Sequence, residues 1–206
     1  MVAILETPRL ILREFTPEDA DALSRVISDP ETMRYYPAPY DRAGVEQWIA
    51  RNRERYKEDG VGLWAMEFKI RASDARIPGS AENEAGDTRV GAPSTGAQGR
   101  SPHELIGDCG LIRQKLDGEH LYEIGYHLRR DCWGQGFATE AARACRDWGF
   151  TELKADLLIS LIRPENLPSR RVAERNGMTI WKDVIWHGMT HLVYSVHRVS
   201  SSNSDL

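Results

Sequence analysis

The segment that most constrains the fold lies between residues 122 and 162. It begins with the strand-like run Tyr-Glu-Ile-Gly-Tyr-His-Leu at 122–128 and continues through a glycine-containing turn into a helix predicted over 135–150. The nearly continuous apolar run Leu-Leu-Ile-Ser-Leu-Ile follows at 157–162, and such a run is typical of a strand buried on both faces. Two strands joined through a helix favour a right-handed crossover between parallel neighbours. The chain is therefore expected to contain a βαβ unit.

The flanking segments extend this unit into a larger sheet. Helical spacing after Thr16, and again between Asp41 and Lys57, predicts two helices, and another opens with Pro168 in its first turn. Further strands are predicted at residues 9–15, 62–70, 105–112, 178–186 and 191–199. The fold class is therefore α/β, with a mixed sheet (α+β) of about six or seven strands and helices on both faces.

Composition changes sharply between residues 71 and 103, where Gly, Ala, Ser, Pro, Asp and Glu dominate and large apolar residues are almost missing. Such a stretch buries too little surface to offset its ordering entropy, so we predict a flexible insertion in the form of an elongated hairpin loop. Neither flank carries a complete core of its own. We therefore expect a single domain over residues 1–199, followed by a disordered tail at 200–206.

Charge and cysteine content narrow the class of protein. The 206-residue chain has a formal net charge of -4, which gives no general reason to expect binding to nucleic acid or to a membrane surface. Its three cysteines lack the spacing of metal ligands, and an odd, sparse set favours free, mostly buried thiols in a reducing compartment. The sequence shows neither a signal peptide nor a run of about 18 apolar residues. We expect a cytoplasmic monomer or homodimer without a metal site.

The turn at residues 130–139 connects a strand to a helix and contains Gly134 and Gly136. Glycines permit unusual backbone angles, so several N–H groups can converge on an anion at the positive end of the helix dipole. This chemistry suits a pyrophosphate, although Gly-x-Gly alone is equally consistent with a simple tight turn. No Lys-Ser/Thr follows the second glycine as in a P-loop, and Thr139 stands where a dinucleotide-binding turn has its third glycine.

Three motifs in order give the sequence a specific resemblance. They are Glu-Ile-Gly-Tyr-His-Leu from Glu123, Trp-Gly-Gln-Gly-Phe-Ala-Thr-Glu-Ala from Trp133, and Asn-Leu-Pro-Ser-Arg-Arg-Val-Ala-Glu-Arg-Asn-Gly-Met from Asn166. Together they resemble the GNAT acetyltransferase superfamily over nearly the whole chain except residues 71–103. The opening Thr-Pro-Arg-Leu-Ile-Leu-Arg from Thr7 is typical of the branch that resembles ribosomal-protein N-terminal acetyltransferases, the RimJ/RimL type.

The resemblance implies a GNAT-like fold that binds acetyl-CoA as cosubstrate. Two splayed parallel strands near 123–128 and 157–162 would hold the pantetheine arm, and the loop at 131–136 would hold the pyrophosphate. The residues implied for acetyl-CoA binding are Tyr126, His127, Leu128, Trp133, Gly134, Gln135, Gly136, Ala138, Thr139, Asn166 and Ser169. Asn166 also suits the N-cap of its helix.

One residue departs from the family pattern, which often has Gln or Arg at the position of Asp131. An acid beside a pyrophosphate is unfavourable unless its side chain points away. Arg129 and Arg130 are the nearby cations that would compensate its charge.

The implied reaction is N-acetyl transfer to a primary amine, either a protein N-terminal α-amine or a small molecule. Glu123 is the first candidate for the general base, directly or through a water, because it occupies the place of the catalytic glutamate in several relatives. The alternative is a carboxylate that pairs with an arginine and only shapes the pocket. Ser169 is the candidate proton donor to the departing thiolate, and backbone N–H groups near 126–128 would hold the oxyanion. No Cys-His arrangement suggests a covalent intermediate, so direct transfer is expected.

Other polar and aromatic residues have weaker assignments. His127 is a secondary candidate for the base, and we expect it to share a face with Glu123 only if the strand carries a bulge. Glu140 is expected to cap the first turn of its helix. Four aromatic residues suit either an acceptor pocket or the core: Tyr35, Tyr36, Trp48 and Trp64.

Two other classes of function stay open beside the enzyme. A non-catalytic acyl-CoA-binding or sensing protein would keep the turn without turnover. A structural or interaction protein with a chance Gly-x-Gly would not bind CoA at all.

Overall fold

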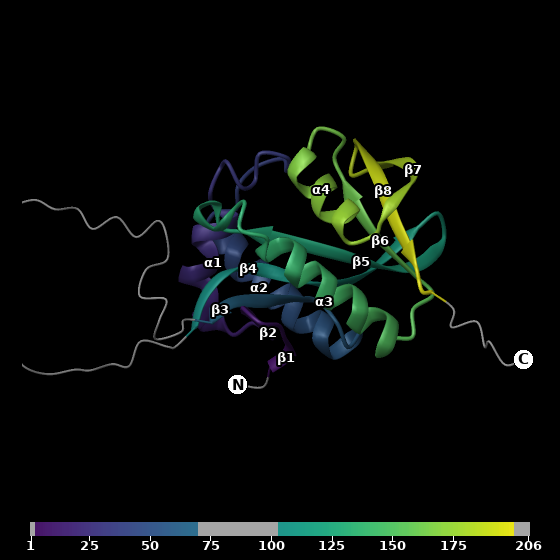
Figure 1. Ribbon diagram of the computed structural model, residues 1–206. Helices are drawn as coiled ribbons and strands as arrows, with labels where there is room; N and C mark the ends of the chain where they lie inside the picture. Colours follow the sequence, from purple (N-terminus) through teal and green to yellow (C-terminus); the bar gives the residue numbers. More distant parts are fainter. Residues whose placement is uncertain (1–2, 70–102, 200–206) are drawn as a thin grey trace, which may run out of the picture.

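The computed structural model describes residues 3–69 and 103–199, which form one eight-stranded sheet with helices on both faces (Figure 1). The strands are β1 (Ala3–Glu6), β2 (Leu10–Arg13), β3 (Leu63–Lys69), β4 (His103–Leu116), β5 (Glu119–Leu128), β6 (Leu157–Ile162), β7 (Thr179–Trp186) and β8 (Met189–His197). The helices are α1 (Ala20–Ile27), α2 (Arg42–Glu58), α3 (Phe137–Thr151) and α4 (Leu167–Arg175). The predicted α/β fold with a mixed sheet is confirmed.

The sheet has the order β1-β2-β3-β4-β5-β6-β8-β7. Only β5 and β6 run parallel, joined through α3 as the sequence predicts, and the other neighbouring pairs are antiparallel. The sheet has eight strands rather than six or seven, because β1 precedes the first predicted strand. This four-residue edge strand is exposed at both ends and pairs only with β2, so it carries no alternating pattern.

The starts of the helices follow local backbone chemistry. The segment after Thr16 begins as a short 3-10 turn, in which the Thr16 N–H donates to Asp19 Oδ2 at 2.7 Å, and α1 continues from Ala20. Asp19 is therefore the acid of a capping box that begins at Thr16. Helix α3 begins at Phe137, two residues later than predicted, because Gly136 has a left-handed backbone conformation with φ 83°.

Two predicted segments lie largely outside the described residues. The insertion predicted at 71–103 does so except for His103, which begins β4, and so does the tail predicted at 200–206. Within the described ranges, no helix is long and apolar enough to span a membrane. All three cysteines lie in the described part of the chain, where they are free and buried, as predicted.

The core has one layer on each face of the sheet. On the face covered by α3, the buried Trp64 ring meets the Trp148 ring edge-on at 5.3 Å. On the opposite face, α1 and α2 pack with a buried ion cluster beside them. Arg13 Nη2 lies 2.7 Å from Asp19 Oδ1 and 2.6 Å from Glu67 Oε1. This cluster connects the turn before α1 to β3 and fixes α1 against the sheet.

Candidate functional site

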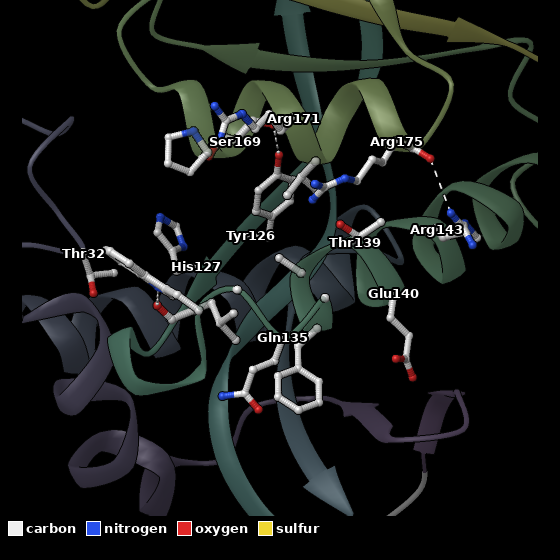
Figure 2. A pocket seen from close by; sticks show the side chains of 18 of the residues that line it. Thr32, Tyr126, His127, Gln135, Thr139, Glu140, Arg143, Ser169, Arg171 and Arg175 are labelled. Carbon is white, nitrogen blue, oxygen red and sulfur yellow. Dashed lines mark hydrogen bonds between the residues drawn. The ribbon is translucent and has the colours of Figure 1, made fainter. Parts of the chain in front are cut away.

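A cleft of about 1160 Å³ opens where β5 and β6 separate. Its walls come from the end of β5, the turn before α3, one side of α3 and of α4, and residues 6–9 and 31–36 (Figure 2). The volume exceeds the range of about 300–1,000 Å³ usual for small-molecule sites, so the cleft accommodates a long ligand. Its lining includes all residues predicted to bind acetyl-CoA: Tyr126, His127, Leu128, Trp133, Gly134, Gln135, Gly136, Ala138, Thr139, Asn166 and Ser169.

Side chains hold the two strands at the point where they separate. The parallel pairing ends at Glu123 and Ile159, which are neighbours in register. Beyond this point Ser160 Oγ donates to the carbonyl oxygen of Ile124 at 2.8 Å, and the Leu161 N–H donates to Glu123 Oε1 at 3.4 Å. These bridges anchor the base of the splay while the strand ends diverge. The predicted splayed pair is present.

The backbone of β5 turns some of its N–H groups toward the cleft. The His127 N–H points to β4, where it donates to Asp108 Oδ1 at 3.0 Å. Alternate amides along a strand point to opposite sides, so those of Tyr126 and Leu128 point toward β6 and the cleft. These two groups lie where the sequence predicts the oxyanion donors.

The turn at residues 130–136 is built by its backbone. Gly134 and Gly136 have φ values of 74° and 83°, and no side chain caps the start of α3. The Gln135 side chain instead donates to the carbonyl oxygen of Asp131 at 3.0 Å, which closes the turn on itself. The first N–H groups of a helix have no partner within the helix and attract an anion. This end of the cleft therefore suits a phosphate group.

The Asp131 carboxylate turns to Arg129 rather than standing unneutralised beside the turn. Arg129 Nε donates to Asp131 Oδ1 at 2.6 Å, and Arg129 also pairs with Glu104 of β4 at 2.6 Å. Burial raises the pKa of Asp131, but the hydrogen bond and charge of Arg129 outweigh it, so the net direction is downward. Arg129 is thus the compensating cation, while Arg130 is exposed.

The N-terminal segment fastens onto the start of α3 through Glu140. Thr7 Oγ1 donates to Glu140 Oε1 at 2.6 Å, and Arg9 donates to the same carboxylate from its backbone N–H and from Nε. Arg9 Nη1 also donates to the Gln135 carbonyl oxygen at 2.9 Å. Glu140 therefore holds the N-terminal segment, and its predicted role as a cap of its own helix is wrong. Burial raises the pKa of Glu140, but Thr7 and Arg9 lower it overall.

Glu123 lies at the base of the splay, where it is half-buried and is not among the residues that line the cleft. Gln114 Nε2 donates to its Oε2 at 2.8 Å, in addition to the bond from Leu161. Burial raises the pKa of Glu123, and these hydrogen bonds together with the charge of Arg55 oppose the rise without cancelling it. A carboxyl group with a raised pKa is suited to proton transfer near neutral pH. Its contacts fit both interpretations given for it, a base and a residue that shapes the site.

His127 shares a face with Glu123 without any bulge. Strand β5 pairs with β4 in unbroken register from Glu119 to Leu128. Residues four apart in a regular strand lie on the same face, so the expected need for a bulge is wrong. His127 Nδ1 lies 2.8 Å from Asp108 Oδ1, and Nε2 lies 2.8 Å from the Tyr36 hydroxyl. The imidazole is therefore held between a strand and the segment that precedes α2.

The start of α4 closes the opposite wall of the cleft. Asn166 Oδ1 accepts the Ser169 N–H at 3.2 Å, which confirms Asn166 as the N-cap. The Tyr126 hydroxyl crosses from β5 and donates to the Ser169 carbonyl oxygen at 2.9 Å, as Figure 2 shows. The Ser169 side chain lines the cleft. The Ser169 hydroxyl is therefore a candidate donor to a ligand on this wall of the cleft.

The aromatic candidates divide between core and cleft. Trp64 belongs to the core, whereas Tyr35 and Tyr36 line the cleft. Trp48 packs against the core beneath α1 and α2, and its Nε1 also donates a hydrogen bond to Asp108 Oδ2 at 3.0 Å. Sequence reasoning did not single out Asp108, although an acid inside the apolar run at 105–112 is a signal of a partnered buried charge.

Comparison with known proteins places this geometry in one family. Residues 9–179 match the acetyltransferase (GNAT) domain. The uncharacterized N-acetyltransferase p20 of Bacillus licheniformis is 34% identical over 180 residues, which cover 87% of this chain and 83% of that protein. No group of three or more His, Cys, Asp or Glu residues that could hold a metal ion occurs in the described ranges.

Solved structures share the fold. An acetyltransferase from Agrobacterium tumefaciens superposes with a TM-score of 0.69 at 26% identity, covering 96% of both chains. RimL, a ribosomal L7/L12 α-N-protein acetyltransferase solved with coenzyme A, has a TM-score of 0.62 at 14% identity, covering 95% of this chain and 98% of that one.

Proposed function

The chain belongs to the GNAT acetyltransferase family, and we propose that it moves the acetyl group of acetyl-CoA onto a primary amine by direct attack. The observation that carries this proposal is that one cleft is lined by all residues predicted to bind acetyl-CoA. Its volume and its two chemically different ends match a ligand with a charged pyrophosphate at one end and a reactive thioester at the other.

Acetyl-CoA would lie along the splay. The glycine turn and the start of α3 would bind the pyrophosphate through backbone N–H groups. The pantetheine arm would occupy the gap between β5 and β6, where the amides of Tyr126 and Leu128 point toward it. The same amides are suited to hold the oxygen of the thioester as negative charge develops on it.

Glu123 is the proposed general base. An amine with pKa near 8, typical of a protein N-terminus, is neutral about a tenth of the time at pH 7, whereas a lysine amine is neutral about once in a thousand. A positioned base contributes roughly 10²–10⁴-fold to such a reaction. The raised pKa of Glu123 and its place on the strand beside the thioester support this role.

Ser169 is the proposed donor to the departing thiolate. Its hydroxyl lines the cleft at the first turn of α4, across from β5. The N-terminal end of a helix favours negative charge nearby, which supports a thiolate leaving at this point. The backbone contacts of Ser169 to Asn166 and Tyr126 fix where the hydroxyl lies.

The acceptor is proposed to be either a protein N-terminal α-amine or a small-molecule amine. RimL illustrates the first kind, but the 14% identity to this chain carries the fold and not the acceptor.

Thiol release from acetyl-CoA tests the proposal. The acceptors are a peptide with a free N-terminus, an aminoglycoside, spermidine and single amino acids, and CoA binding is measured by calorimetry in parallel. Turnover with one class supports the proposal and identifies the acceptor. Binding without any turnover points to an acyl-CoA sensor, and failure to bind CoA contradicts the proposed use of the cleft.

A further inference from the structure

A line of hydrogen bonds connects the interior of the sheet to the cleft. Asp108 of β4 is fully buried, with 0% of its surface exposed. Its Oδ1 accepts from the backbone N–H of His127 at 3.0 Å and lies 2.8 Å from His127 Nδ1. Its Oδ2 accepts from Trp48 Nε1 at 3.0 Å. The carboxylate is thus held by donors from β5 and α2.

This arrangement determines the tautomer of His127. A carboxylate accepts hydrogen bonds and donates none, so Nδ1 carries the proton that faces Asp108. In the neutral imidazole Nε2 then has the lone pair, and the Tyr36 hydroxyl at 2.8 Å is its donor. Desolvation of its hydroxyl, with the negative charges of Glu123 and Asp108, raises the pKa of Tyr36, so its phenol keeps the proton that it donates.

Aromatic neighbours fix the orientation of the imidazole. The Tyr36 and Trp48 rings lie 5.2 Å and 5.4 Å from the His127 ring, measured between centroids. His127 itself is buried, whereas 42% of the Tyr36 surface is exposed and both residues line the cleft. Tyr36 is therefore the member of this line that is more accessible from the cleft.

The proton balance of amide formation leaves a role for such a line. A protonated primary amine loses two protons when it becomes an amide, and the proposed base Glu123 accounts for one of them. The second leaves the nitrogen as the N–C bond forms. A hydroxyl joined to a neutral imidazole and a buried carboxylate is a common means of accepting a proton in an enzyme.

We propose that Tyr36, His127 and Asp108 form a proton-transfer chain, in which the Tyr36 hydroxyl takes the second proton of the acceptor nitrogen and passes its own proton to His127 Nε2. This inference rests on the acetyl transfer proposed above. Tyr36 is the catalytic residue of the chain because it contacts the acceptor. His127 and Asp108 act through Tyr36 as positioning residues.

The step balances in atoms and charge. The amine nitrogen forms the N–C bond and loses its proton to Tyr36 Oη, and the imidazolium that results lies beside the Asp108 carboxylate. The C–S bond breaks, and the thiolate takes the proton of Ser169. The His127 proton then returns through Tyr36 and water to Ser169. One proton per turnover reaches solvent, by way of Glu123.

The first test compares two tyrosines of the same segment. Tyr36→Phe keeps the ring and removes the hydroxyl, and we expect kcat to fall about 10–100-fold while CoA binding by calorimetry stays within about two-fold. Tyr40→Phe is the matched control, because Tyr40 packs on Trp48 at 5.4 Å rather than on His127. The control is expected to keep wild-type kcat. Wild-type kcat in Tyr36→Phe would overturn the proposal.

The pH profile of kcat separates proton transfer from a structural role. Besides its own members, the titratable groups that face the chain are Glu123 and Tyr126 on β5, Tyr40 before α2, Tyr56 on α2 and Cys109 on β4. Arg55 on α2 acts on Glu123. Asp108→Asn removes the charge beside the imidazolium, so the acid limb of the profile should move to lower pH as kcat falls. A lower kcat with an unmoved acid limb would contradict the chain.

Nitrogen NMR of the imidazole tests the chain independently of turnover. His127→Gln identifies the His127 signals among those of the six histidines. We expect the neutral tautomer protonated at Nδ1 in the wild-type protein and its loss in Asp108→Asn. The Nε2-protonated tautomer in the wild-type protein would overturn the chain even if the enzyme is active. Absence of turnover with every acceptor would instead contradict the proposed function.

Discussion

The two ends of the cleft are built in different ways. The turn end is made by consecutive residues, whose backbone and two left-handed glycines form the proposed anion site. The opposite end is lined by Tyr36 before α2 and His127 on β5, and Asp108 on β4 and Trp48 on α2 hold His127 from behind. A contiguous backbone site is readable as a motif, whereas a site assembled from distant side chains appears only once the sheet has brought them together.

The largest expected effect is a loss of kcat without a loss of CoA affinity. Glu123→Gln keeps the shape of the side chain and its bond from the Leu161 N–H, so kcat should fall about 10²–10³-fold if Glu123 is the base. CoA affinity should stay within about two-fold, because the change lies outside the turn. Steady-state kinetics and calorimetry check both quantities. Wild-type kcat would assign Glu123 to shaping the splay.

A substitution in the glycine turn should instead weaken CoA binding. Gly134→Ala forces a side chain into φ 74°, and the resulting shift of N–H groups should weaken CoA binding about 10–100-fold, the value of one or two charged hydrogen bonds. Gly188→Ala is the matched control, since Gly188 has φ 76° in the β7–β8 turn and an added Cβ there also meets open space. Both variants should lose about 1–2 kcal/mol of stability. Equal CoA affinity in the two variants would contradict the anion site.

The contact of the N-terminal segment with Glu140 should contribute less to CoA affinity than the glycines do. Arg9→Ala removes the cation that neutralises Glu140 and the bond to the Gln135 carbonyl oxygen. We expect CoA affinity to fall about 3–10-fold, a small effect because the Arg9 side chain is 40% exposed. Arg25→Ala on α1 is the control, and its CoA affinity by calorimetry should equal that of the wild type. An unchanged CoA affinity in Arg9→Ala would show that the turn keeps its conformation without the contacts of Arg9.

The smallest expected effect concerns stability at the base of the splay. Since burial raises the pKa of Glu123, the folded state holds its proton more tightly than the unfolded chain does. The wild-type protein is therefore penalised above the raised pKa, and Glu123→Gln should have the higher Tm at pH 8. The difference should vanish as pH falls below the ordinary Glu value of about 4.3. Thermal unfolding of both proteins across this pH range measures the difference in Tm. A lower Tm for the variant at pH 8 would contradict the prediction.

Local signals explain why much of the fold was predictable. The glycine turn, the apolar β6 and the N-cap Asn166 each depend on neighbours in sequence, and each was found where expected. The edge strand β1 was missed because it is short and lacks alternation. The need for a bulge before His127 was wrong because residues four apart in a regular strand lie on the same face, and β5 stays regular along β4.

Side-chain partners between distant segments were not predictable from one sequence. Glu140 resembles a helix cap, and only the fold brings Thr7 and Arg9 to it. Asp108 resembles an unfavourable acid in a buried strand until Trp48 and His127 approach from both sides. The sequence shows that these residues are polar, but their partners can be identified only when the order of the strands in the sheet is known.

The contact between Thr7 and Glu140 also bears on how the protein is made. The two residues are separated by 133 positions, so Thr7 leaves the ribosome long before its partner is synthesised. Closing so long a loop costs entropy that only the assembled sheet offsets. The contact that fastens the turn before α3 is therefore expected to form late in folding, when these two distant segments of the chain meet.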